Sequence, residues 1–260
     1  MRYFVVDAFA DHVFTGNPAG VCLINQWPSD EVLQCIAAEN NLSETAFVAP
    51  LAQGEWQLRW FTPQQEVDLC GHATIGTAFV LSNFVDTSLT EAVFHTLSGP
   101  LLVTRRGDLF EMDLPARPPH SIEVTPLMTE ALGVRILEAH KGERDHLLLV
   151  ESEKLVRAMQ PKNRLIAAIP DSFGIIVTAR GESCDFVSRF FAPNAGIPED
   201  PVTGSSHATL IPFWAARLGK VDMAAQQLSR RGGTLYCSLS GDRVRVAGRA
   251  VLYLEGTLNL

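Results

Sequence analysis

FTPQQEVDLCGHATIGTAFV, residues 61–80, decides the fold, because much of its pattern returns in FFAPNAGIPEDPVTGSSHATL, residues 190–210. Each copy starts in an aromatic segment that predicts a strand, and it continues through a Pro turn and an acidic loop. Small residues then open an apolar segment that predicts a buried helix. Such an echo indicates two related halves, whose equivalent loops could bind opposite faces of one small molecule.

The sequence around these copies predicts strands about one apolar helix in each half. In the first half we expect strands at 1–9, 21–24, 45–49, 55–61, 92–97, 101–105 and 109–113, a loop at 16–20, and helices at 29–40 and 74–84. In the second half we expect helices at 126–132 and 207–218, short helices between 151 and 173, strands at 135–139, 146–151, 173–178 and 186–191, and a run of strands from 228 to 258. Sequential strands with short Gly turns favour an α+β fold with curved mixed or antiparallel sheets.

Three prolines within residues 115–119 form the best linker in the chain, because proline stops both helix and sheet. We therefore predict an N-terminal domain at 1–115 and a C-terminal domain at 116–260, with the C-terminal strand free to pack back onto the first. The stretch 125–170 carries no motif that we can place, and it is a candidate for shaping substrate specificity.

Composition excludes several classes of function. The formal net charge is −8 and there is no Lys/Arg run, so we expect no nucleic-acid partner and no membrane attraction. Asp7 and Asp11 interrupt the N-terminal apolar run, which argues against a signal peptide, and no uncharged stretch could span a bilayer. The five cysteines are scattered without CxxC pairs, which argues against disulfides and predicts a cytoplasmic protein.

The two small-residue loops are candidate carboxylate cradles. Unpaired N–H groups at a helix N-terminus attract anions, and Gly71 and Gly204 would let a ligand approach them closely. His72 could reach a ligand at the helix tip, and it ranks above His207 for this role. Ordinary helix caps remain the open alternative. The histidine spacing suggests no metal site.

Two acids stand out, although the residues alone favour solvated side chains for both. Glu44 lies in NLSETAFV beside Leu42 and Phe47, where burial would raise its pKa and make it a usable acid and base. Asp200 lies in a Pro-bounded turn and could orient a substrate group or hold His72. We expect Asp68 to be its counterpart in the first copy.

FTGNPAGV, NLSETAFV, FTPQQEVDLCGHATIGTA and FFAPNAGIPEDPVTGSSHA together resemble the phenazine biosynthesis PhzF-like isomerases, which are related to diaminopimelate epimerase. The motifs stand in the family's order across residues 7–219. The resemblance implies two similar domains related by a pseudo-two-fold axis, with the active site in the cleft between them. It also implies cofactor-independent proton transfer between carbons of a small carboxylic acid, and it makes a homodimer an expectation.

Family roles fall on matching positions. By this resemblance Glu44 is the acid/base, and His72, Asp200 and Ser205 complete the polar catalytic set. N–H groups at Gly71, His72, Gly204 and Ser205 would bind the substrate carboxylate, and Asn17 is a weaker ligand contact. Cys70 matches one of the two cysteines of diaminopimelate epimerase and is also expected at the substrate.

Two other functions stay open. The first is a racemase, epimerase or dehydratase that uses Cys70 with a different partner; the second copy has no cysteine in its loop, which disfavours a two-thiol mechanism. The second is a non-catalytic protein that binds small carboxylates. The substrate itself cannot be named from the residues, because specificity transfers less readily than fold.

Overall fold

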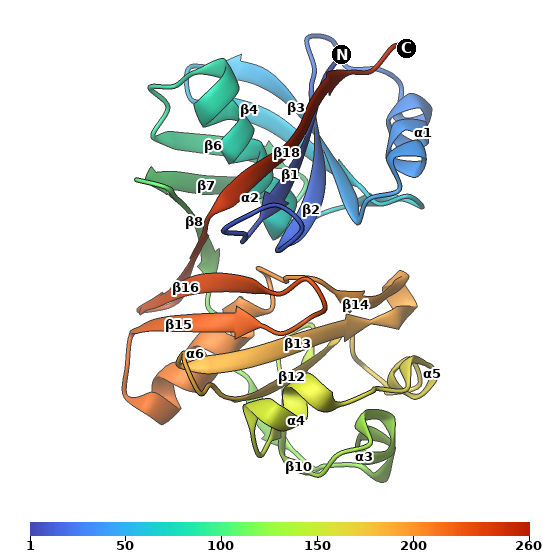
Figure 1. Ribbon diagram of the computed structural model, residues 1–260, viewed down its shortest axis with the longest axis vertical. Helices are drawn as coiled ribbons and strands as arrows, with labels where there is room; N and C mark the ends of the chain where they lie inside the picture. Colours follow the sequence, from blue (N-terminus) through green and yellow to red (C-terminus); the bar gives the residue numbers. More distant parts are fainter. The chain divides into compact units, whose positions relative to one another are not determined.

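The computed structural model describes residues 1–260, and the chain forms two compact units. Unit 1 comprises Met1–Asp113 and Ala247–Leu260, and unit 2 comprises Leu114–Val246. The first boundary lies beside the predicted linker. The second boundary adds the C-terminal strand to unit 1, a packing that the sequence analysis left open, because this strand pairs with the first from Arg2↔Thr257 to Ala8↔Ala250. Both units combine helices and mixed sheet, which makes the fold α+β (Figure 1).

Unit 1 is a mixed sheet with two helices and a π-helical turn. Its strands are β1 (Arg2–Ala8), β2 (Asn17–Leu23), β3 (Glu44–Ala52), β4 (Glu55–Phe61), β5 (Glu66–Val67), β6 (Glu91–Thr96), β7 (Gly99–Arg106), β8 (Leu109–Pro115) and β18 (Ala250–Thr257). Its helices are α1 (Asp30–Asn40), α2 (Gly71–Val80) and the π-helical η1 (Leu81–Val85). Pairing runs antiparallel from β18 to β1 to β2, parallel to β3, antiparallel to β4 and parallel to β6.

Unit 2 repeats this plan. Its strands are β9 (His120–Ile122), β10 (Ile136–Lys141), β11 (His146–Val150), β12 (Ile175–Arg180), β13 (Phe186–Ala192), β14 (Ile197–Asp200), β15 (Asp222–Gln227), β16 (Gly233–Ser240) and β17 (Arg243–Gly248), the last of which runs past the unit boundary. Its helices are α3 (Pro126–Leu132), α4 (Glu153–Ala158), α5 (Asn163–Ile166), the 3₁₀ turn η2 (Pro193–Ala195) and α6 (His207–Leu218). Pairing again runs antiparallel from β9 to β10 to β11, parallel to β12, antiparallel to β13 and parallel to β15.

The central helix of unit 1 is α2, as its apolar composition predicts. It packs on β1 and β2 (Figure 1), and a side chain at Gly76 would meet Val6 and Ala19 of these strands at 3.5–3.8 Å. The helix begins at Gly71, three residues earlier than predicted, and its last predicted turn is the π-helix η1. This early start places Gly71 and His72 in the first helical turn.

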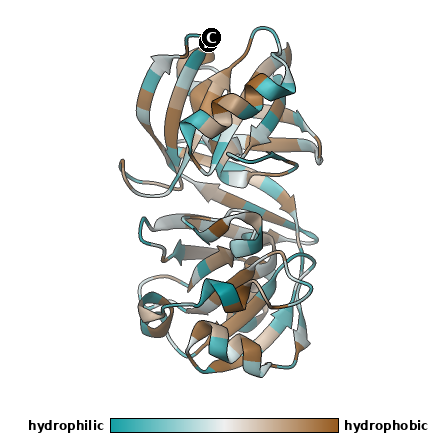
Figure 2. Ribbon diagram, turned by 90° about the vertical axis from the view of Figure 1, so that its right-hand side faces the viewer, coloured by the Kyte–Doolittle hydropathy of each residue, from teal (hydrophilic) through white to brown (hydrophobic).

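Helix α1 packs on a hydrophobic cluster formed by the sheet and buries Leu33, Ile36 and Ala37 against residues that include Tyr3 and Phe47. Figure 2 shows its mixed teal and brown faces. In unit 2, α3, α4 and α5 bury apolar side chains against β11 to β13 in the same way. None of the helices is long and apolar enough to cross a membrane.

Two differences from the expected elements bear on the site. Asn17–Gly20, predicted to be a loop, forms the first half of β2. Pro18 is tolerated because it lies near the start of the strand, where only β1 pairs with it and the pairing to β3 has not begun. Strand β15 was not predicted, because its sequence, DMAAQQ, has low β-propensity.

Candidate functional site

The candidate site in unit 1 joins side chains from two paired strands, β2 and β3, and from helix α2. Glu44 is the first residue of β3 and pairs in register with Ala19 of β2. His72 lies in the first turn of α2, and Asn17 begins β2. All three side chains are buried, with 8% of Glu44, 4% of His72 and none of Asn17 exposed. The expectation of a solvated turn is therefore wrong for Glu44. Its pairing with β2 keeps the side chain buried.

His72 lies between a carboxylate and an amide. Its Nε2 atom is 3.1 Å from Oε2 of Glu44, and its Nδ1 atom is 3.1 Å from Nδ2 of Asn17. With Nδ1 accepting from the amide, the neutral ring carries its proton on Nε2, facing the carboxylate. The Glu44 contact lacks hydrogen-bond alignment, and the buried Oε2 atom has no other hydrogen-bond partner. This oxygen is therefore available to a substrate proton.

Charges around His72 favour its protonated form. Burial acts against the imidazolium, but the charges of Cys70 and Glu44 and the close contacts of these two side chains with the ring raise the pKa of His72 well above its ordinary value. Burial and the Glu44 charge raise the pKa of the Cys70 thiol to about 11. Because the thiol is then neutral at pH 7, Glu44 is the charge that acts on His72. Full protonation requires the Asn17 amide to turn its oxygen toward Nδ1.

Cys70 is the N-cap residue of α2 and lies against the same ring. Its Sγ atom is 3.5 Å from Nδ1 and 3.8 Å from Nε2 of His72. The cysteine is buried, and its raised pKa makes it a thiol rather than a thiolate. The structure therefore brings four of the predicted residues together in unit 1: Asn17, Glu44, Cys70 and His72, with Gly71 beside them in the same helical turn.

In unit 2, Asp200 ends β14 and is buried rather than solvated. The hydroxyl of Thr203 donates to its Oδ2 atom at 2.5 Å. Fully buried Gln227 of β15 accepts from the Thr203 N–H and donates to the Asp200 carbonyl and to the Thr203 hydroxyl. Sequence reasoning missed Thr203 and Gln227, because no local pattern marks a side chain that acts across 24 residues.

Gly204 and Ser205 precede helix α6 instead of opening it. They form a turn in which His207 N–H bonds to the Gly204 carbonyl and Ala208 N–H to the Ser205 carbonyl. Ser205 is partly exposed. His207 is fully buried, and its Nδ1 atom lies 2.9 Å from the Thr203 carbonyl. Burial lowers the pKa of His207 to about 4, so this ring serves packing and loop geometry, in agreement with its lower ranking.

Strand register shows which residues of the two units are equivalent. Arg59 and Arg189 hold Glu66 and Glu199, respectively, through matching two-point ion pairs. Beside them, Trp60 pairs with Val67, and Phe190 pairs with Asp200.

The counterpart of Asp200 is therefore Val67, and the prediction of Asp68 is wrong. Counting along each chain segment from Val67 and Asp200, Cys70 is equivalent to Thr203, Gly71 to Gly204 and His72 to Ser205. Sequence comparison misplaced the acids because the turns that precede them differ in length.

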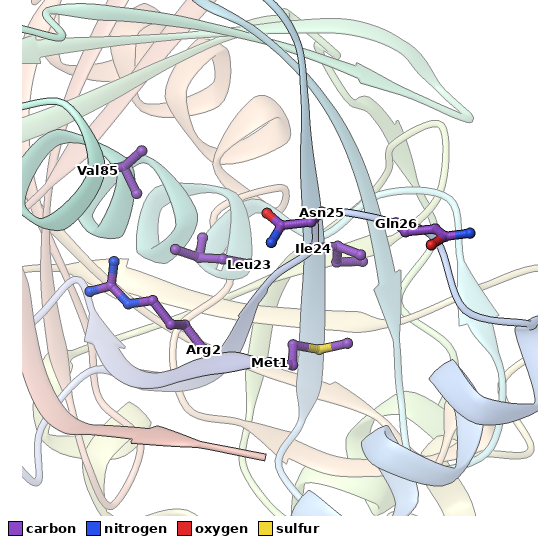
Figure 3. A pocket seen from close by; sticks show the side chains of 7 residues that line it. All are labelled: Met1, Arg2, Leu23, Ile24, Asn25, Gln26 and Val85. Carbon is purple, nitrogen blue, oxygen red and sulfur yellow. The ribbon is translucent and has the colours of Figure 1, made fainter. Parts of the chain in front are cut away.

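A pocket of about 450 Å³ in unit 1 lies at a different place (Figure 3). It is lined by the start of β1 and by the end of β2 with the residues that follow it. Arg2 points toward this pocket, but its guanidinium already bonds to Glu255 and to the Phe84 carbonyl. The chemistry of the Glu44 cluster makes it the stronger candidate site, because polar and nucleophilic groups converge there.

Comparisons with known proteins show the family of this chain. The family model for phenazine biosynthesis-like proteins, PhzC-PhzF, matches residues 6–256. The chain belongs to this family. A protein of Pseudomonas aeruginosa named an uncharacterized isomerase is 50% identical over 260 residues, which cover 100% of this chain and 99% of the relative.

The structure of a PhzF family protein from Enterococcus faecalis superposes with a TM-score of 0.97 at 45% identity, covering 100% of this chain and 99% of that one. A probable proline racemase from Agrobacterium radiobacter shares the fold alone, with a TM-score of 0.67 at 13% identity over 100% of this chain and 93% of that one. Family membership and the names of the relatives support an isomerase-type enzyme.

Proposed function

We propose that this protein is a cofactor-independent isomerase that moves a proton between carbons of a small carboxylic acid, with Glu44 as the general acid and base. The observation that carries the proposal is the buried Glu44 carboxylate, whose Oε2 atom lies 3.1 Å from His72 and has no hydrogen-bond partner. A buried carboxylate with an unoccupied oxygen can remove a proton from carbon, hold it, and deliver it to a second carbon.

His72 would support both steps. Its Nε2–H faces the carboxylate and stabilises the negative charge of Glu44 before the proton is taken. The N–H groups of the first turn of α2, at Gly71 and His72, lack helical partners and suit a substrate carboxylate. Roles for Asp200, Gly204 and Ser205 of unit 2 remain proposals that substitutions can test.

A thiol-based racemase is the second candidate, and two observations count against it. The Cys70 thiol has a pKa of about 11, so little thiolate is present at neutral pH. The equivalent position in unit 2 is Thr203, which offers no second thiol. A non-catalytic carboxylate-binding protein is the third candidate, and the same experiment separates it from an enzyme.

The test is carbon–hydrogen exchange in D₂O. Candidate cyclic amino acids and hydroxy acids are incubated with the protein, and NMR detects deuterium at carbon. We expect Glu44→Gln to lower the exchange rate by about 100- to 10,000-fold, because an amide cannot carry the proton. Glu39→Gln, which alters an exposed carboxylate on α1, serves as the matched control and should exchange at the wild-type rate. Full exchange in Glu44→Gln contradicts the proposal, and binding without any exchange favours the carboxylate-binding protein.

A further inference from the structure

Three different metal-binding side chains converge in unit 1. Glu44 offers a carboxylate oxygen, Cys70 a sulfur and His72 an imidazole nitrogen, and these atoms all lie within 4.8 Å of one another. Zinc is bound by this mixture of donors, commonly by three protein ligands with a fourth position left open. Hard cations such as Mg²⁺ prefer oxygen ligands alone, so the set selects a thiophilic cation.

We propose that Glu44, Cys70 and His72 bind one thiophilic divalent cation of the Zn²⁺ type, and that the bound ion blocks proton transfer by Glu44. The binding half stands on the side-chain geometry. The blocking half rests on the proposed function.

The distances suit a shared ion. Zinc bonds of about 2.0–2.3 Å at tetrahedral angles place neighbouring ligand atoms roughly 3.2–3.6 Å apart. In the protein, Nε2 of His72 is 3.1 Å from the Glu44 oxygen and 3.8 Å from the Cys70 sulfur. The third pair, the Glu44 oxygen and the Cys70 sulfur, lies within 4.8 Å, so shifts of up to about 1 Å complete the coordination. They would also satisfy the buried Glu44 oxygen that lacks a hydrogen-bond partner.

The surroundings of the cluster favour a defined site. Asn17 lies 3.1 Å from Nδ1 of His72; with its amide oxygen turned toward the ring it accepts the Nδ1 proton, which leaves Nε2 free as the ligand and fixes the ring, as second partners of metal-bound histidines do. Backbone elements hold each ligand: the start of β3 for Glu44, and the N-cap and first turn of α2 for Cys70 and His72. Binding converts the Cys70 thiol to a thiolate bound to the ion and releases its proton to water. The thiolate and the carboxylate then balance the ion's two charges.

Unit 2 provides an internal comparison. By strand register, Gly174 matches Glu44, since Val177 pairs with Arg189 as Phe47 pairs with Arg59. Thr203 and Ser205 match Cys70 and His72. These residues include no carboxylate, thiol or imidazole, so the repeated scaffold by itself does not create the site.

The direct test uses cobalt(II), which reports thiolate ligation by an intense charge-transfer band. The full chain is stripped with a chelator and titrated with Co²⁺ alone. We expect one equivalent to produce the band and Zn²⁺ to remove it by displacement. Cys70→Ser should abolish the band, and Asn17→Ala should weaken affinity about 10- to 100-fold. Cys35→Ser, which alters an exposed cysteine on α1, should leave the band and the affinity unchanged. His72→Gln provides a second ligand variant if Cys70→Ser fails to fold.

The outcomes are separable. No band in the wild type, or a band that survives Cys70→Ser and disappears in Cys35→Ser, overturns the binding site. In the D₂O assay, one equivalent of Zn²⁺ should suppress exchange at least about tenfold and chelator should restore it. If Zn²⁺ binds without slowing exchange while Glu44→Gln is inactive, the blocking half is wrong and the proposed function stands. If Glu44→Gln remains active, the proposed function fails while the cobalt titration still decides the binding site.

Discussion

The loops that lead into α2 and α6 follow strands with the same register, yet they hold different side chains. In unit 1 the loop brings Cys70 and His72 against Glu44, and all three are reactive or ionisable. In unit 2 the equivalent positions are Thr203, Ser205 and Gly174, and a hydrogen-bond network takes their place. The same arrangement of strands therefore supports a cluster suited to proton transfer in unit 1 and a polar loop held by hydrogen bonds in unit 2.

Packing around Gly174 explains why unit 2 has no side chain equivalent to Glu44. A Cβ atom at this position would lie 2.3 Å from the ring of Phe190. The Phe190 ring therefore excludes a side chain at the position where unit 1 has Glu44. Packing around Gly174 therefore keeps an acid out of unit 2 at the position that Glu44 occupies in unit 1.

The largest stability difference between the units should come from the paired arginines. Arg189 is buried, and it also donates to the carbonyls of Val156 and Met159, whereas the further partner of Arg59 is the exposed Asp30. We expect Arg189→Met to lower the unfolding free energy by about 3–5 kcal/mol, because Glu199 and two carbonyls lose their partner.

Arg59→Met is the matched variant, and it should cost only about 1 kcal/mol because its ion pairs are more exposed. Chemical denaturation measures both. Equal losses would show that the two ion pairs are energetically alike and that the extra bonds of Arg189 contribute nothing.

A smaller effect is expected at Gln227. Gln227→Met keeps the apolar volume but leaves the Thr203 N–H and the Asp200 carbonyl without this partner. The loss should be about 2–4 kcal/mol in unfolding free energy. Gln226→Met, at the more exposed neighbouring position of β15, is the control and should change stability little. A neutral Gln227→Met would show that the unit 2 loop is held by other contacts.

The smallest effect has the opposite sign. By strand register, Asp145 and His146 of unit 2 are equivalent to Ala19 and Gly20 of unit 1. Burial raises the pKa of Asp145 to about 6. Because the pKa of Asp145 is higher in the folded protein than in the unfolded chain, the unfolded chain ionises first as pH rises. The free energy of unfolding therefore falls between about pH 4 and pH 6.

Asp145→Asn should therefore stabilise the protein by roughly 1–3 kcal/mol above pH 6 and by nothing near pH 4. Thermal melts across this range measure the effect, with Asp68→Asn on an exposed loop as the control. A gain that is the same at both pH values would exclude ionisation as its cause.

Several elements follow from local sequence. Helix α3 occupies the predicted residues 126–132 and α6 the predicted 207–218, even with Pro212 inside it. The aromatic strands before both loops were also predicted, since alternation and Pro punctuation are short-range signals. The burial of Glu44 was not predicted from the residues, because it depends on the parallel pairing of β3 with β2.

By itself the sequence determined the α+β class, the two related halves and the four motifs that identify the family. Composition, periodicity and turn residues act over a few positions and are visible in the chain. Only the tertiary structure decided that Asn17, Glu44, Cys70 and His72 meet, that Val67 rather than Asp68 matches Asp200, and that Gln227 locks the second loop. Those facts depend on strand register and packing between distant segments, which no local pattern contains.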